Sequence, residues 1–101
     1  MAYTTIDKPT DYFNTVLYTG NTSGQSITGV GFQPDFLWIK ARSAAYQHSV
    51  RNIIRGSTKT LRANDTNAEA TQSDSVTSFD SDGFTLGADT SSFVNENSAT
   101  Y

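Results

Sequence analysis

The feature that most constrains the fold is the spacing of the apolar residues along the chain. They fall into short runs, and turn-forming residues interrupt these runs roughly every eight to twelve residues. Such short runs, several of them alternating with polar residues, are typical of β-strands. The chain is therefore predicted to be all-β, with an antiparallel β-sandwich as the favoured architecture. The predicted strands are residues 11–19, 25–29, 36–41, 48–55, 59–63, 76–80 and 84–86, and a further strand begins at residue 99.

The most apolar stretch is GFQPDFLWIK, residues 31–40, which contains the only Trp of the chain. Pro34 and Asp35 predict a turn, because proline fixes its φ angle and Asp favours bends. Residues 36–41 then form an almost continuous apolar run, which is the pattern of a strand buried on both faces. We therefore expect this segment to be the central strand, with the ring of Trp38 in the core.

The sequence Asp80-Ser-Asp82-Gly83 separates two of the predicted strands. An Asp-Gly pair between such runs is a strong signal for a tight hairpin turn. Carboxylates at alternate positions followed by glycine also resemble half of a calcium-binding loop, so Asp80 and Asp82 are the candidate metal ligands. The full calcium pattern needs a bidentate Glu about six residues after the glycine, and Asp89 is the only later carboxylate nearby. We favour the hairpin and predict no bound metal.

The two ends of the chain differ from its middle. Residues 1–10 have no periodicity and contain a proline, so they are predicted to form an arm that orders on docking. The β-sandwich domain is expected to span residues 11–101. Its last strand looks incomplete, because its pattern has only begun at Tyr101. Either the chain was cut, or a partner subunit supplies the missing strand by strand addition. The candidate assembly contacts of the arm are Tyr3, Ile6 and Pro9.

The 101-residue chain has a net charge of −3 and no cysteine, which excludes disulfides and thiolate metal sites. No apolar run reaches transmembrane length, and the N-terminus lacks a signal-peptide pattern. Six of the seven Lys and Arg residues lie between Lys40 and Arg62, whereas every charged residue after Arg62 is an acid. This separation allows two interpretations: a basic strand pair beside acidic loops in one fold, or complementary faces that meet between subunits. The negative net charge argues against nucleic-acid binding.

No set of residues in the sequence indicates catalysis, so we predict a protein that is not an enzyme and uses no cofactor. His48 is the only histidine, and a general base needs a nucleophile and an orienting acid that the sequence does not place beside it. We expect its imidazole to bond to the backbone. The candidate contacts for a ligand or a host surface are Tyr46, Gln47 and His48, where an aromatic ring and polar groups could bind a sugar.

Two blocks of the sequence carry a family resemblance: GVGFQPDFLWIKAR at residues 29–42 and SFDSDGFTLG at residues 78–87. They resemble the motifs of a virion structural protein family of tailed bacteriophages, chiefly those of marine bacteria and cyanobacteria. The resemblance extends over residues 12–101 and implies a jelly-roll sandwich similar to laminin-G or concanavalin domains. Two features depart from the family pattern. Asn52 stands where an Asp is usual, and the strand VAWNWKA that follows the family's Thr-Tyr pair is missing here.

The resemblance implies a non-enzymatic structural protein, made in the host cytoplasm and placed in the virion as a fibre, tail appendage or capsid decoration. Its partners would be other virion proteins and copies of itself, without nucleic acid and without membrane insertion. The alternative is a carbohydrate-binding module that recognises host surface glycans through Tyr46, His48 and neighbouring Asn and Asp side chains.

Overall fold

A computed structural model describes residues 8–101 and shows an all-β fold, as the sequence predicts. The described residues contain no α-helix, and their one helical element is the 3-10 turn η1 (Pro9–Asp11). Accordingly, no helix in this part of the chain is long and apolar enough to span a membrane. The strands are β1 (Gln25–Ile27), β2 (Phe36–Ile39), β3 (Ser49–Asn52), β4 (Lys59–Thr60), β5 (Ala70–Thr71), β6 (Val76–Asp80) and β7 (Gly83–Leu86).

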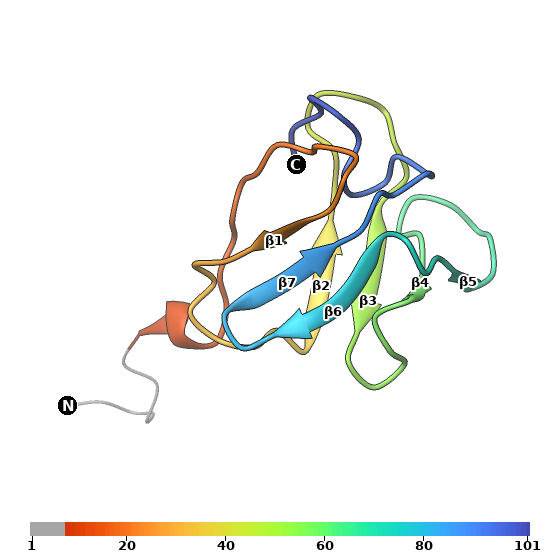
Figure 1. The fold of residues 1–101 in the computed structure, drawn as a ribbon. Coiled ribbons are helices and arrows are strands. Elements are labelled where there is room, and N and C mark those ends of the chain that lie inside the picture. Colours follow the sequence, from red (N-terminus) through yellow and green to blue (C-terminus); the bar gives the residue numbers. More distant parts are fainter. Residues whose placement is uncertain (1–7) are drawn as a thin grey trace.

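All strand pairs are antiparallel. The front sheet in Figure 1 has the order β1-β7-β6, and the sheet behind it pairs β2 with β3. A short ladder joins β4 to β5, and Leu61, just after β4, forms a bridge to Val50 of β3. Because successive side chains of a strand point to opposite faces, each main sheet has an inner face toward the other sheet and an outer face.

The hydrophobic core fills the space between these two sheets. Ile27, Phe84 and Leu86 enter it from the front sheet, and Leu37 and Ile39 enter it from β2. Each of these side chains is at most 9% exposed. Other buried members of the core are Ala41, Val76, Val94, Ala99 and Tyr101.

Strands β6 and β7 form the predicted hairpin, with Asp80 opposite Gly83 across the turn. The carboxylate of Asp82 in the turn accepts hydrogen bonds from the backbone N–H groups of Gly29 (2.9 Å) and Gly31 (2.7 Å). Both of these glycines have a positive φ, a conformation in which a residue with a side chain would be strained. The tip of the hairpin therefore also holds the loop between β1 and β2 in place.

The strand predicted at residues 36–41 is present but ends at Ile39, and the prediction that it is buried on both faces is wrong. Leu37 and Ile39 point into the core, whereas Phe36 and Trp38 are 57% and 59% exposed. The strand is not central either, because β2 pairs only with β3 in the described sheets. It is a half-buried edge strand, the kind that an antiparallel sheet with one solvated face produces.

The predicted first strand, residues 11–19, is not a strand over most of its length. Only Thr19 of this segment forms a β-bridge, to Thr100. Phe13 and Leu17 are 73% and 70% exposed. The segment has the alternating pattern of a strand, but no neighbouring strand among residues 8–101 completes a ladder along it. The prediction fails because a β-strand needs a partner as well as a pattern.

The predicted assembly arm is described only in part. Pro9 begins the η1 turn, and residues 9–11 of this turn are exposed. Tyr3 and Ile6 lie outside the described residues.

Two other segments differ from their predictions. The strand that was expected to continue to residue 55 ends at Asn52, and Ile54 lies in a turn with 91% of its side chain exposed. The segment 64–75, predicted to be an exposed loop, contains the short strand β5 and the buried residues Gln72 and Ser75. In both segments the backbone finds a bonding partner: the N–H of Gly56 donates to the carbonyl oxygen of Asn52, and the N–H of Gln72 donates to that of Thr58.

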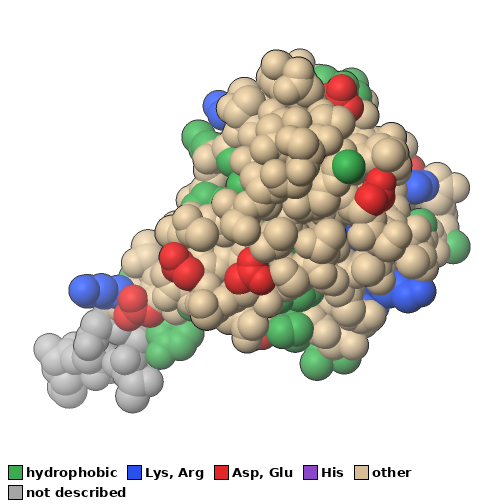
Figure 2. Space-filling model, in the orientation of Figure 1, with side chains coloured by type: hydrophobic (Ala, Val, Ile, Leu, Met, Phe, Trp, Pro, Cys, Tyr) green, Lys and Arg blue, Asp and Glu red, His purple; other side chains and the backbone are tan. Residues whose placement is uncertain are grey.

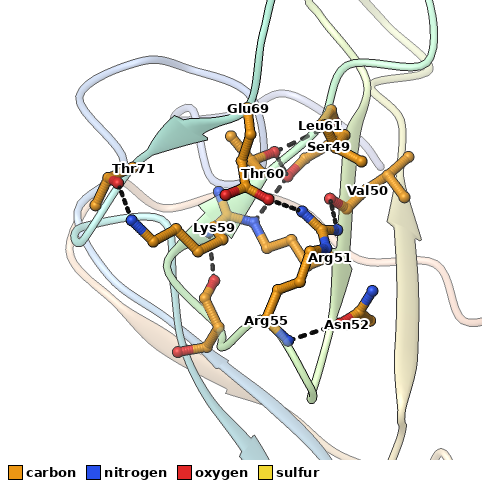
Figure 3. A network of polar contacts seen from close by, with 11 residues as sticks. Ser49, Val50, Arg51, Asn52, Arg55, Lys59, Thr60, Leu61, Glu69 and Thr71 are labelled. Carbon is orange, nitrogen blue, oxygen red and sulfur yellow. Dashed lines mark hydrogen bonds and ion pairs between the residues drawn. The ribbon is translucent and has the colours of Figure 1, made fainter.

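The inner face of β3 carries Arg51, which is fully buried. Its guanidinium donates hydrogen bonds to the hydroxyl group of Ser49 at 2.9 Å and to the side-chain oxygen of Gln72 at 3.0 Å. The Ser49 hydroxyl is also bonded to that of Thr60 at 3.0 Å, as Figure 3 shows. Burial lowers the pKa of Arg51 to about 10, so the side chain stays charged at neutral pH and is stabilised by neutral acceptors.

The other cations of the basic segment have different surroundings. Arg55 forms an ion pair with Glu69 at 2.6 Å (Figure 3), the only ion pair within residues 8–101. Arg62 lies over the ring of Phe93, 5.3 Å from its centre. Since Glu69 belongs to the acidic part of the sequence, this pair fits the interpretation in which basic strands and acidic loops meet within one fold.

Candidate binding surface

Four apolar side chains lie together on the outer face of β2 and β3. Trp38 stands opposite Val50 in the strand register, and Val50 stands opposite Leu61, so these three form a row across the strands. Phe36 extends the row along β2, because residues two apart share a face. We name Phe36, Trp38, Val50 and Leu61 the aromatic face.

The other side of the molecule has a different character. Figure 2 views the molecule from the side of β1, β7 and β6, where polar side chains and backbone dominate and acidic groups are scattered. Hydrophobic side chains lie mainly at the margins of this view. An exposed apolar area with a polar border is a mark of an interaction site. The aromatic face is therefore the candidate binding surface.

Trp38 is held in place by His48, which lies directly before β3. The indole N–H donates a hydrogen bond to Nδ1 of His48 at 3.0 Å. Because an indole nitrogen can only donate, Nδ1 must be the acceptor, and the proton of the neutral imidazole is on Nε2. The backbone N–H of His48 donates to Oδ1 of Asn64 at 3.0 Å. The imidazole thus bonds to a side chain and not to the backbone as predicted, and it fixes an exposed aromatic ring.

Polar groups border the aromatic face along the loop after Leu61. A shallow hollow of about 450 Å³ lies here, and Arg62, Asp65 and Asn67 line it together with the apolar side chains. Nε of Arg62 and Oδ2 of Asp65 are buried and have no hydrogen-bond partner in the described part of the chain. A rigid aromatic ring with a polar rim suits a protein partner or a sugar ring.

The three ligand contacts predicted from the sequence do not form one site. His48 belongs to the aromatic face through its bond to Trp38. Tyr46 packs against the core, and the side-chain oxygen of Gln47 is buried without a hydrogen-bond partner among residues 8–101. Sequence reasoning missed Trp38, because it treated the run as continuously apolar. The available signal was the alternation of two aromatic residues, Phe36 and Trp38, with aliphatic ones.

The candidate calcium ligands, Asp80 and Asp82, already have donors within the protein. Asp80 accepts hydrogen bonds from the hydroxyl groups of Thr85 (2.5 Å) and Ser78 (2.7 Å). Hydrogen bonds lower the pKa of both carboxyl groups below their ordinary values. Residues 8–101 hold no cluster of three or more His, Asp or Glu side chains that could bind a metal. The hairpin turn accounts for both Asp residues.

The chain belongs to the family described as "Domain of unknown function (DUF7483)", whose model matches residues 8–101. No curated protein and no solved structure matches the chain. The family description names no activity.

Proposed function

We propose that this member of the DUF7483 family is a non-enzymatic structural protein of a tailed-phage particle, and that it binds another virion protein or a second copy of itself through the aromatic face. Its place would be a fibre, a tail appendage or a capsid decoration. The observation that carries the proposal is the exposure of Trp38 and Phe36, more than half in each case, on a regular strand. Tryptophan is among the residues that contribute most to binding energy at protein interfaces.

The sequence blocks at residues 29–42 and 78–87 support the phage assignment through their resemblance to phage virion proteins. The fold is compatible with it, because two antiparallel sheets packed around one core are what a jelly-roll sandwich contains. We therefore propose the jelly roll as the full architecture. The orientation of Trp38, fixed by His48, reduces the entropy that binding has to offset.

The first experiment locates the protein. Phage particles whose genome encodes this chain are purified and analysed by mass spectrometry and by immunogold labelling. We expect the chain to be a stoichiometric component at a defined position on the particle. A chain that is abundant in infected cells but absent from purified particles would show the phage-structural proposal to be wrong.

The second experiment tests the surface. Binding of the chain to particles, and to itself by sedimentation velocity, is compared between the natural sequence and Trp38→Ala. The matched control is Ile54→Ala, which removes an exposed apolar side chain outside the aromatic face. We expect binding to weaken at least about tenfold in Trp38→Ala and to stay unchanged in the control. Equal binding by both variants would exclude the aromatic face as the contact surface.

A second candidate function, carbohydrate binding, is favoured by one specific observation. The bond between the indole of Trp38 and His48 holds the ring as a flat platform, and Asn64 and Asn67 lie close to this face. A glycan array probed with the natural chain, Trp38→Ala and Tyr46→Ala tests it. Binding lost in Trp38→Ala would support a sugar site on the aromatic face. Binding lost only in Tyr46→Ala would support the loop site predicted from the sequence, and an array without signal would exclude both.

A further inference from the structure

The hydrogen bond between Trp38 and His48 exists in only one protonation state of the imidazole. The indole N–H donates to Nδ1 at 3.0 Å, and the two ring centres are 5.9 Å apart. A neutral imidazole has one nitrogen that accepts a hydrogen bond, whereas an imidazolium carries a proton on both nitrogens and accepts none. Protonation of His48 therefore sets two donors against each other, and the bond is lost.

Little else fixes the indole of Trp38. Its N–H is the only hydrogen-bonding group of the ring, and 59% of the side chain is exposed. The neighbours of Trp38 on the outer face are Phe36 on its own strand and Val50 opposite it, and they leave most of the ring uncovered. Without the bond to His48, the ring can turn between the staggered rotamers of its side chain.

The backbone of His48 is held independently of the imidazole. Its N–H donates to Oδ1 of Asn64 at 3.0 Å, and the next residue, Ser49, pairs with Ile39 of β2. Neither contact involves a group that gains a proton near neutral pH. We therefore expect protonation to change the position of the two rings and to leave the pairing of β2 with β3 in place.

On the β2 side, the charged group beside His48 is a cation. Lys40 directly follows Ile39, and His48 directly precedes Ser49, so both lie at the same end of the ladder. The ammonium group of Lys40 donates to the carbonyl oxygen of Ala41. A positive charge on the imidazole would be repelled by this ammonium group.

The loop after β4 carries two further charged groups, Arg62 and Asp65, which line the hollow beside Trp38. Oδ1 of Asp65 accepts the backbone N–H of Asn67 at 2.8 Å. No carboxylate among residues 8–101 forms an ion pair with His48. Protonation of the imidazole therefore breaks one hydrogen bond and gains no ion pair in its place.

We propose that Trp38 and His48 form a pH switch of the aromatic face: neutral His48 fixes the indole, and protonated His48 releases it. Histidine is the side chain that ordinarily changes its charge between pH 5 and pH 8, and His48 is the only histidine of the chain. A fixed ring loses less entropy on binding than a mobile one, so the aromatic face binds more weakly in acid. This last step rests on the proposed function of the aromatic face, whereas the switch itself rests on the geometry of the two rings.

The switch is tested by NMR on the folded chain between pH 7 and pH 5. Trp38 is the only tryptophan, so a ¹⁵N-labelled chain gives a single indole N–H signal. We expect this signal to move as the pH falls, and to follow the same titration curve as the Cε1 proton of His48. An indole signal that stays in place while the imidazole titrates would overturn the switch, and so would an imidazole that stays neutral down to pH 5.

The matched control is His48→Asn, because the amide oxygen of Asn can accept the indole N–H but does not titrate. Its indole signal should stay in one position between pH 7 and pH 5. His48→Ala has no acceptor and should show the signal of the released ring at both pH values. If His48→Asn shifted with pH as the natural chain does, acid would be acting through another group and the switch would be wrong.

A binding arm separates the switch from the proposed function. Binding to purified particles, and of the chain to itself, is measured at pH 7 and pH 5. We expect the natural chain to bind about twofold to tenfold more weakly at pH 5, the cost of immobilising one side chain, and His48→Asn to bind equally at both. A titrating indole with pH-independent binding would overturn the control of binding by the switch. Absence of binding at pH 7 would count against the proposed function alone, because the NMR result decides the switch without a partner.

Discussion

The corner around Arg51 and the edge formed by residues 12–18 both break the rule that apolar side chains are buried and charged ones exposed. They break it in opposite directions. Arg51 is fully buried, whereas Leu17 is 70% exposed. Arg51 has hydrogen-bond acceptors on Ser49 and Gln72, but residues 14–17 form no backbone–backbone hydrogen bond within residues 8–101. In this small fold the availability of partners decides burial, because a segment enters the interior only when its polar backbone is also satisfied.

The largest contrast is expected between two leucine substitutions. Leu86→Ala removes a side chain that is 1% exposed in the core and should lower the free energy of unfolding by about 3 kcal/mol, through lost burial and a residual cavity. Leu17→Ala makes the same chemical change at the open edge and should cost less than about 0.5 kcal/mol. Urea denaturation followed by circular dichroism measures both. Similar losses would mean that residues 12–18 are packed in solution, and the comparison would fail.

A second pair of substitutions sharpens the corner side of the comparison. Arg51→Ala leaves the side chain of Gln72 without its donor and opens a cavity, and we expect a loss of about 2 to 3 kcal/mol. The loss should stay below that of Leu86→Ala, because removing a buried charge also removes its desolvation cost. Arg55→Ala breaks the more exposed pair with Glu69 and should cost at most about 1 kcal/mol. Equal losses of unfolding free energy in Arg51→Ala and Arg55→Ala would show that the charge of an arginine, and not its burial with satisfied partners, determines its contribution to stability.

The same comparison explains which parts of the fold could be predicted from the sequence. The hairpin of β6 and β7 was predictable, because its turn and both strands are neighbours in sequence. The segment 11–19 has an equally clear alternation, but its state depends on a strand that would have to lie beside it, and no local pattern reports that. The exposure of Trp38 was missed for the same reason, since it depends on the absence of a covering layer.

The buried position of Arg51 could not be predicted either. Its acceptors come from Ser49 in its own strand and from Gln72, which is far away in the sequence. Polar patterns in a single sequence do not show which distant amide will meet which guanidinium. The binding surface was predicted in part, because His48 belongs to it but Tyr46 does not.

At the aromatic face we expect a smaller effect. Trp38→Ala should leave the chain folded and change the free energy of unfolding by about 1 kcal/mol or less, because the ring is 59% exposed. His48→Ala should be milder still, but it should weaken the near-UV circular dichroism of the indole by releasing its N–H bond. An unfolded Trp38→Ala variant would instead indicate that the ring is a core residue in solution, as the sequence alone suggests.

The smallest effect is expected from acid, and it should fall on the hairpin side and not on the open edge. Hydrogen bonds lower the pKa of three carboxyl groups there, mainly from Thr90 to Asp74, from Thr85 to Asp80 and from Gly29 to Asp82. A carboxyl group whose pKa is lowered by folding stabilises the native state above its unfolded pKa, and this contribution is lost as the pH falls through the folded value. Stability should therefore decline below about pH 4.

Because these groups lie close to solvent, the decline should be gradual. Urea midpoints between pH 6 and pH 3 measure it, and Asp80→Asn is the informative variant, because a neutral amide can still accept a hydrogen bond but does not titrate. The variant should lose less stability than the natural chain over this range. If residue-resolved hydrogen exchange at pH 3 showed the amide of Tyr18, which bonds to Tyr101, opening before those of β6 and β7, acid would be acting on the open edge. The assignment of pH-dependent stability to the hairpin would then be wrong.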